Sequence, residues 1–122
     1  MAINAINWFE IPAADMERAV KFYNTILGIN IQSVAMGGGK YAFLPSEGGV
    51  GGAIGQGEAY EPGSGKGTII YLHVDGDLNS ALDKVEAAGG KVVVSKSPLG
   101  PDGFFARLLD SEGNMIGLFS PH

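Results

Sequence analysis

Hydrophobic and polar positions follow the same order twice along the chain. Residues 7–28 read NWFEIPAADMERAVKFYNTILG, and residues 68–90 read TIIYLHVDGDLNSALDKVEAAGG. Each segment opens with a short apolar run typical of a buried strand and passes through a short polar turn. Each then continues with apolar residues spaced three and four apart, as on one side of a helix. The repeat, offset by about 62 residues, predicts two tandem copies of one strand and helix unit.

Both predicted helices have recognisable ends. Asp15 and Asp77 stand where a side chain can accept hydrogen bonds from the free amides of a first helical turn. Gly28 and the pair Gly89 and Gly90 stand where a left-handed residue ends a helix without steric cost. The sequence therefore predicts helices over residues 15–27 and 77–88.

Short apolar segments between turns predict the remaining strands. In the first unit we expect strands at residues 3–11, 29–35, 40–44 and 50–55, and in the second at 68–74, 91–96, 104–109 and 115–120. The glycine-rich stretch 55–67 has the composition of a flexible loop between the units. We expect one α+β domain over residues 1–122, made of two tandem βαβββ units at about 1–57 and 66–122.

Composition narrows the classes of partner. The chain has 122 residues, 45% of them hydrophobic, and a net charge of -5, which disfavours nucleic acid and anionic membranes as partners. It contains no cysteine, so thiolate metal sites and a cysteine nucleophile are excluded. The opening residues do not have the pattern of a secretory signal, and no stretch is apolar enough to span a membrane, so we expect a cytoplasmic protein.

The opening strand, the helix DMERAVKFYNTILG and the closing segment DSEGNMIGLF resemble the vicinal oxygen chelate superfamily. This superfamily includes glyoxalase I, extradiol dioxygenases, and bleomycin-resistance and fosfomycin-resistance proteins. The resemblance covers essentially the whole chain. It implies a curved mixed sheet of eight strands around a cavity, with the helices outside. It also implies a homodimer, in which strands of both chains often complete each cavity.

The resemblance also locates the positions at which metal-dependent members carry their ligands. The motifs place these positions at Trp8, Gly52, Ile69 and Gly117. Zinc, iron, nickel and manganese require imidazole, carboxylate or thiolate donors, and none of these four residues offers one. We therefore expect no metal and no other cofactor.

The same positions indicate a pocket for a small organic molecule. Trp8 offers a flat ring, and Gly52 and Gly117 leave space beside it, which suits a planar or apolar ligand. In the alternative interpretation, Trp8 fills the place of the metal and packs the core. Strand alternation and the family register add further residues to this pocket. The expected ligand-binding set is Trp8, Glu10, Gly52, Ile69, Tyr71, His73, Phe105, Arg107, Gly117 and Phe119.

Two functions remain open from the sequence. The first is metal-independent binding of a small organic molecule in the cavity, with the glycine-rich loop closing over it. The second is an enzyme of the same superfamily, a lyase or isomerase, with Glu10 or His73 as its acid or base. A structural interpretation stands beside both, in which His73 bonds to Asp75 or the following turn and Glu10 pairs with Arg107.

Overall fold

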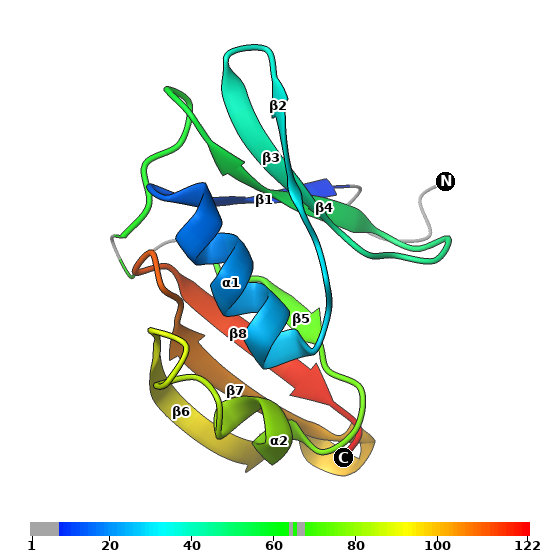
Figure 1. Ribbon diagram of the computed structural model, residues 1–122. Helices are drawn as coiled ribbons and strands as arrows, with labels where there is room; N and C mark the ends of the chain where they lie inside the picture. Colours follow the sequence, from blue (N-terminus) through cyan, green and yellow to red (C-terminus); the bar gives the residue numbers. More distant parts are fainter. Residues whose placement is uncertain (1–7, 64, 66–67) are drawn as a thin grey trace.

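Two four-stranded sheets and two helices make up the fold (Figure 1). The computed structural model describes residues 8–63, 65 and 68–122. The first unit contains β1 (Trp8–Pro12), α1 (Met16–Leu27), β2 (Ser33–Met36), β3 (Gly39–Leu44) and β4 (Gly51–Gln56). The second contains β5 (Tyr71–His73), α2 (Leu78–Leu82), β6 (Lys91–Pro98), the short 3₁₀ helix η1 (Gly100–Asp102), β7 (Phe104–Leu109) and β8 (Met115–Ser120).

The two sheets have the same strand order. It is β1-β4-β3-β2 in the first sheet and β5-β8-β7-β6 in the second. The first strand of each unit pairs in parallel with the last one, and the other pairs are antiparallel. The predicted α+β fold with mixed sheets is therefore confirmed, and the sheet consists of two separate halves.

The predicted ends of α1 are confirmed. The carboxylate of Asp15 accepts a hydrogen bond from the amide of Arg18 at 3.2 Å, and Gly28 ends the helix with a φ of 66°. The second helix begins as predicted, because Asp77 accepts from the amide of Asn79 at 2.9 Å. Both aspartates act as N-caps, as their positions in the sequence indicate.

The second helix is shorter than predicted. The α-helical pattern covers Leu78–Leu82, and turns continue the chain to Gly89. The amides of Lys84 and Val85 bond to carbonyls three residues back, so the backbone tightens after the first turn of α2. Val85 is still buried in the core, as its apolar spacing predicts. A tighter helical turn keeps residues that are three positions apart on nearly the same side of the segment.

The remaining boundaries differ in detail. The strand predicted over residues 29–35 is found at Ser33–Met36, and the strand predicted over 68–74 is reduced to Tyr71–His73. Of the strand predicted over 3–11, residues 3–7 lie outside the part that the structure describes. None of the described helices is long and apolar enough to cross a membrane.

One core joins the two units. Its members include Ile11 and Ile54 from the first sheet, Leu72 and Leu118 from the second, and Phe22 from α1. Helix α1 lies between the two sheets (Figure 1). We call the side of each sheet that faces this core its inner face and the opposite side its outer face. The outer faces are therefore turned away from the shared core.

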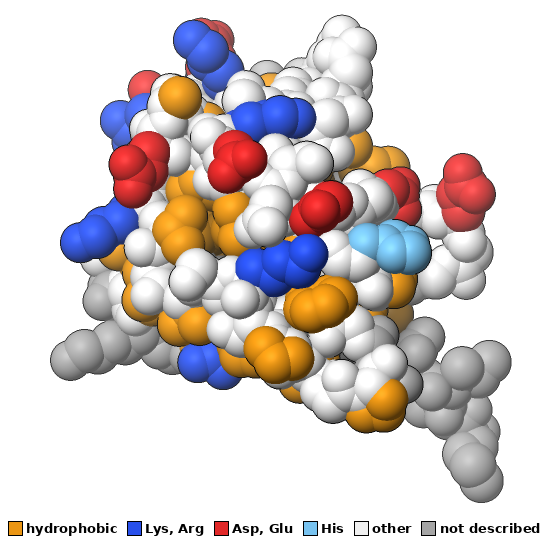
Figure 2. All heavy atoms as spheres, turned by 90° about the horizontal axis from the view of Figure 1, so that it is seen from below, with side chains coloured by type: hydrophobic (Ala, Val, Ile, Leu, Met, Phe, Trp, Pro, Cys, Tyr) orange, Lys and Arg blue, Asp and Glu red, His pale blue; other side chains and the backbone are white. Residues whose placement is uncertain are grey.

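The polar residues on the underside of the molecule do not form a patch of one sign. Lys, Arg, Asp and Glu side chains are interspersed there with apolar ones (Figure 2). Binding to nucleic acid requires clustered positive charge, and this side does not provide it.

Candidate functional site

The outer face of the first sheet carries an ordered cluster around Glu10. The indole nitrogen Nε1 of Trp8 donates a hydrogen bond to Glu10 Oε2 at 3.1 Å, and the hydroxyl of Tyr60 donates to Glu10 Oε1 at 2.7 Å. Trp8 and Glu10 share this face because they are two residues apart on β1. Each carboxylate oxygen of Glu10 thus holds one aromatic side chain in place.

Other aromatic rings extend this cluster. The rings of Trp8 and Phe43 are 6.1 Å apart and tilted by 55°, and those of Tyr41 and Tyr60 are 6.0 Å apart and nearly perpendicular. Hydrogen bonding to Tyr41 and then to Glu10 raises the pKa of the Tyr60 hydroxyl, so Tyr60 stays protonated and remains a donor. The cluster is a broad aromatic surface with Glu10 at its centre.

Trp8 lies on the surface of the chain. Trp8 is 48% exposed as a residue, and Phe43 is 44% exposed. A core tryptophan is nearly buried, so the interpretation of Trp8 as core filling does not describe this chain. A half-exposed indole with a bonded nitrogen is suited to contact a ligand or a second chain.

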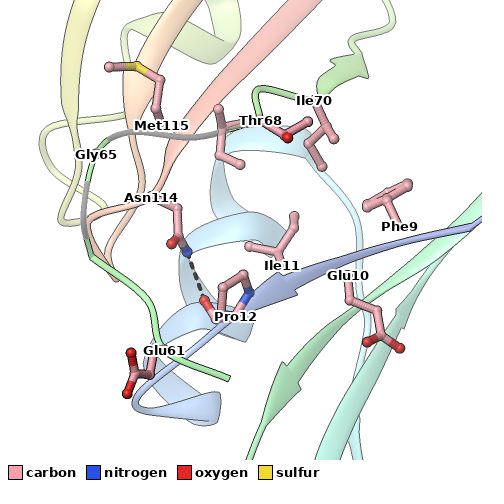
Figure 3. Close-up of a pocket in the computed structure, with 11 residues that line it drawn as sticks. Phe9, Glu10, Ile11, Pro12, Glu61, Gly65, Thr68, Ile70, Asn114 and Met115 are labelled. Carbon is pink, nitrogen blue, oxygen red and sulfur yellow. Dashed lines mark hydrogen bonds between the residues drawn. The ribbon is translucent and has the colours of Figure 1, made fainter. Parts of the chain in front are cut away.

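Glu10 points away from the second unit. A cavity of about 300 Å³ lies between β1 and the start of the second unit, lined among others by Phe9, Ile11, Ile70 and Asn114. In Figure 3, Phe9 and Ile11 extend toward Ile70, whereas the Glu10 carboxylate extends to the other side of β1. The amide of Asn114 donates to the carbonyl of Pro12 at 2.7 Å and closes one end of this cavity.

The outer face of the second sheet carries a second cluster, built around Arg107. The Nε of Arg107 donates to the hydroxyl of Tyr71 at 2.7 Å, and its guanidinium lies 5.7 Å from the ring centre of Phe105. The register pairs both Arg107 and Tyr71 with Gly117, so the three positions are adjacent. The guanidinium is therefore fixed by a hydrogen bond and by contact with aromatic rings.

His73 lies at the edge of this second cluster. Its Nε2 is 3.1 Å from Oδ1 of Asp75, and its side chain is 60% exposed. The ring of Phe119 lies 6.4 Å away. This hydrogen bond to Asp75 is the contact that we expect where His73 has a structural role and not a catalytic one.

Neither predicted glycine leaves open space. A β-carbon on Gly52 would come within 2.4 Å of the Phe9 ring, and one on Gly117 within 2.3 Å of the Tyr71 ring. Gly52 also packs on Phe9 on the inner face, away from Trp8. The space expected beside Trp8 is therefore absent at Gly52, and Gly51 is the glycine that contacts the Trp8 ring.

The predicted ligand set is divided between the two sheets. Trp8 and Glu10 lie on the outer face of the first sheet, and Gly52 lies on its inner face. A groove of about 920 Å³ brings Gly52 and Ile69 together with Tyr71 and His73, and apolar residues at the end of α1 also line it. On the outer face of the second sheet, strand register brings together the remaining members, which are Tyr71, His73, Phe105, Arg107, Gly117 and Phe119.

The expected pair of Glu10 and Arg107 is not formed within the chain. Glu10 bonds to Trp8 and Tyr60, and Arg107 bonds to Tyr71, because the two charged groups belong to different sheets. That part of the structural interpretation is wrong for a single chain.

The residues at the family's metal positions do not fit a metal. Trp8 and Ile69 have no suitable donor atom, and the places of missing side chains at Gly52 and Gly117 are filled by aromatic rings. Among the described residues no three His, Asp or Glu side chains gather in a group that could hold an ion.

Sequence reasoning did not include three residues of the first cluster. Tyr41 and Phe43 alternate on the predicted strand over residues 40–44, and this alternation is a signal for a shared face. Tyr60 comes from the glycine-rich loop, where no periodic pattern indicates which way a side chain points. Its ring lies over Gly55, where a β-carbon would come within 2.5 Å of it.

Comparison with known proteins identifies the family. The model of the Glyoxalase/Bleomycin resistance protein/Dioxygenase superfamily matches residues 5–118, so the chain belongs to this superfamily. A "Glyoxylase-like domain-containing protein" of Didymella fabae is 34% identical over 113 residues, which are 89% of this chain and 88% of that protein. A Mycobacterium tuberculosis protein provisionally named glyoxylase CFP32 is 29% identical over 119 residues. The chain spans 44% of the length of that mycobacterial relative.

Solved structures show the same fold. TnmS3, an antibiotic binding protein from Streptomyces sp. CB03234, is 26% identical with a TM-score of 0.68, and the match covers 100% of this chain and 99% of TnmS3. A glyoxalase I mutant from Zea mays has a TM-score of 0.72 at 19% identity, over 93% of this chain and 45% of the maize chain. At that identity, the maize enzyme supports the fold alone.

Proposed function

We propose that the protein binds a small, flat, largely apolar organic molecule without a metal, in a cavity that two chains build together. The observation that carries this proposal is the state of Trp8, a residue that is 48% exposed although Glu10 holds its ring nitrogen at 3.1 Å. A ring that is fixed before binding loses little conformational entropy when a ligand stacks on it. The similarity to an antibiotic binding protein supports the same class of function.

Pairing of two chains supplies the second wall of the cavity. Each outer face exposes large apolar side chains, including Trp8 and Phe43 on one sheet and Tyr71 on the other. Exposed apolar surface of this kind marks a contact with another molecule. A homodimer that places the first sheet of one chain opposite the second sheet of its partner covers both faces and forms two equivalent cavities.

The candidate acids and bases favour binding over catalysis. Both oxygens of Glu10 already accept hydrogen bonds from neutral donors, so its role is to position Trp8 and Tyr60. His73 is exposed at a strand end beside Asp75, away from Glu10. A general base requires a proton of the substrate within hydrogen-bond reach, and both Glu10 and the Nε2 of His73 already hydrogen-bond to neighbouring side chains.

The glycine-rich loop contributes through Tyr60. Its ring lies against Gly55, and its hydroxyl bonds to Glu10, which places this part of the loop beside Trp8. We propose that the described part of this loop, residues 55–63, covers a ligand bound on Trp8.

Tryptophan fluorescence tests the proposal directly, because Trp8 is the only tryptophan of the chain. Flat aromatic compounds are titrated into the purified protein, and a stacked compound changes the emission saturably. Replacing Trp8 by Ala then weakens binding by about 1 to 3 kcal/mol, and replacing it by Phe costs less. Compounds that bind both proteins equally and leave the emission unchanged would place the site elsewhere.

A further inference from the structure

We propose that the ligand carries a carboxylate, or another pair of oxygen atoms that share negative charge, and that Arg107 binds it. This inference rests on the proposed function, because it names the chemistry of the ligand in the same cavity. It concerns the second wall, which is the outer face of the second sheet. Arg107 lies near the middle of that wall, on β7, with Tyr71, Phe105 and Gly117 around it.

The position of Arg107 follows from a chain of contacts that begins at Gly117. The Tyr71 ring lies on the backbone of Gly117, where a β-carbon would come within 2.3 Å of it. In this position the Tyr71 hydroxyl accepts a hydrogen bond from Arg107 Nε at 2.7 Å. Gly117 therefore admits the tyrosine ring, and the ring fixes the guanidinium.

The remaining donors of Arg107 are available to a ligand. Its Nε donates a hydrogen bond to Tyr71. Among the described residues, its two terminal nitrogens form no salt bridge and no hydrogen bond. A guanidinium is planar and presents its terminal donors in a fork that matches a carboxylate in two parallel hydrogen bonds. The nearby rings of Tyr71 and Phe105, at 5.9 and 5.7 Å, restrict its motion.

The charge of this wall favours an anion. Arg107 forms no ion pair among the described residues, and the carboxylate of Asp75 bonds to His73 at the edge of the face. On the opposite wall, Glu10 is the charged residue, and both its oxygens accept hydrogen bonds. Closing the cavity removes water from Arg107, and a buried guanidinium without a counter-charge is costly. A ligand carboxylate supplies that charge.

Calorimetry with a matched pair of probes tests the inference. The probes are 2-naphthoate and 2-naphthamide, which share one flat ring system and differ in charge. We expect the carboxylate to bind at least about tenfold more tightly than the amide, and this preference to weaken at high salt. In the Arg107→Gln protein the two probes bind alike, and Arg107→Lys recovers only part of the preference, since an ammonium cannot form the two parallel bonds.

Two further variants separate positioning from charge. Tyr71→Phe removes the hydroxyl that holds Nε and lowers the preference while the charge of Arg107 is unchanged. Lys84→Gln removes one positive charge at an exposed position after α2, and it leaves the preference unchanged. Both variants keep the backbone at Gly117 unaltered.

The outcomes distinguish this inference from the proposed function. Equal binding of both probes to the natural protein, with a fluorescence change at Trp8, would overturn the role of Arg107 and leave the aromatic site standing. A preference that depends on Arg107 and survives Trp8→Ala would support Arg107 and remove Trp8 from the site. If the preference persists in the Arg107→Gln protein, the guanidinium does not bind the carboxylate of the probe, and the inference is wrong.

Discussion

Arg18 and Glu112 form an ion pair that joins the two units. The Nε of Arg18, on α1, donates to Glu112 Oε2 at 2.7 Å, and the Glu112 side chain is completely buried. The other carboxylate oxygen accepts from the backbone amides of Ala14 and Asp15 at 2.8 and 2.9 Å. Glu112 lies in the turn between β7 and β8. A carboxylate of the second unit therefore binds the backbone amides that lead into α1 of the first unit.

The first prediction follows from the protonation of Glu112. Burial alone would raise its pKa, but hydrogen bonds from Arg18, Asp15, Ser111 and Ala14 lower the pKa to about 2. A carboxylate with a lowered pKa stabilises the fold above its ordinary pKa, and this contribution is lost as pH falls toward the folded value. We therefore expect part of the free energy of unfolding to disappear between about pH 4.5 and pH 2.

Replacing Glu112 by Gln tests this contribution. At pH 7 the variant loses about 2 kcal/mol of unfolding free energy, because an amide cannot replace a charged acceptor for five donor groups. The difference from the natural protein shrinks as pH falls below 4. The sequence supplies a matched control in Glu47, which occupies the same place in the first Ser-Glu-Gly turn but is exposed. Denaturant melts of Glu47→Gln should show little change at any pH.

Gly52 and Gly51 provide a second prediction. A β-carbon on Gly52 would come within 2.4 Å of the Phe9 ring on the inner face, whereas one on Gly51 would lie 3.2 Å from the Trp8 ring. Gly52→Ala should therefore cost about 1 to 3 kcal/mol of stability through overpacking. Gly51→Ala should cost less and should shift the emission of Trp8. Thermal melts and fluorescence of both variants check this, and equal losses of stability would contradict the assignment of faces.

The sequence predicted the fold well because its signals are local or repeated. Asp15 and Gly28 mark both ends of α1 by chemistry that acts within one helical turn. The repeat then identified the second unit. The length of α2 could not be read in this way, since its apolar spacing is compatible with both an α-helix and the tighter turns that follow Leu82.

The site was harder to predict because it depends on how the units pack. Strand alternation placed Tyr71, and the family register placed Arg107 and Phe105, on one face, where the strand register and the bond of Arg107 to Tyr71 bring them together. Neither pattern can show that Trp8 faces away from them. That separation is set by long-range contacts such as the bond of Asn114 to Pro12, 102 residues apart in the chain. Successive residues of a strand face opposite sides, so an error of one residue changes the face. The sequence placed Gly52 beside Trp8, and in the structure Gly51 lies there.

The third prediction concerns metals. The purified protein should contain no stoichiometric zinc, nickel, iron or manganese, because Trp8, Gly52, Ile69 and Gly117 offer no donor atoms at the family's metal positions. Elemental analysis measures this after purification without chelator. A melting temperature that falls on addition of chelator would contradict it, since bound ions stabilise the folded state.

The last prediction is that the chain forms a homodimer through its outer faces. On the first sheet, Val34, Met36 and Phe43 are 44 to 49% exposed, and the Phe43 ring lies 6.1 Å from that of the half-exposed Trp8, which is a large apolar area for a monomer. Replacing Phe43 by Lys introduces a charge at the centre of this area, so burying it against a second chain becomes costly. We expect light scattering at micromolar concentration to show a dimer for the natural protein and a monomer for Phe43→Lys. Asn79→Lys, at an exposed position of α2, adds the same charge outside the sheets and should remain dimeric. A natural protein that is monomeric would remove the second wall of the proposed cavity, and a dimer that survives Phe43→Lys would show that another surface joins the chains.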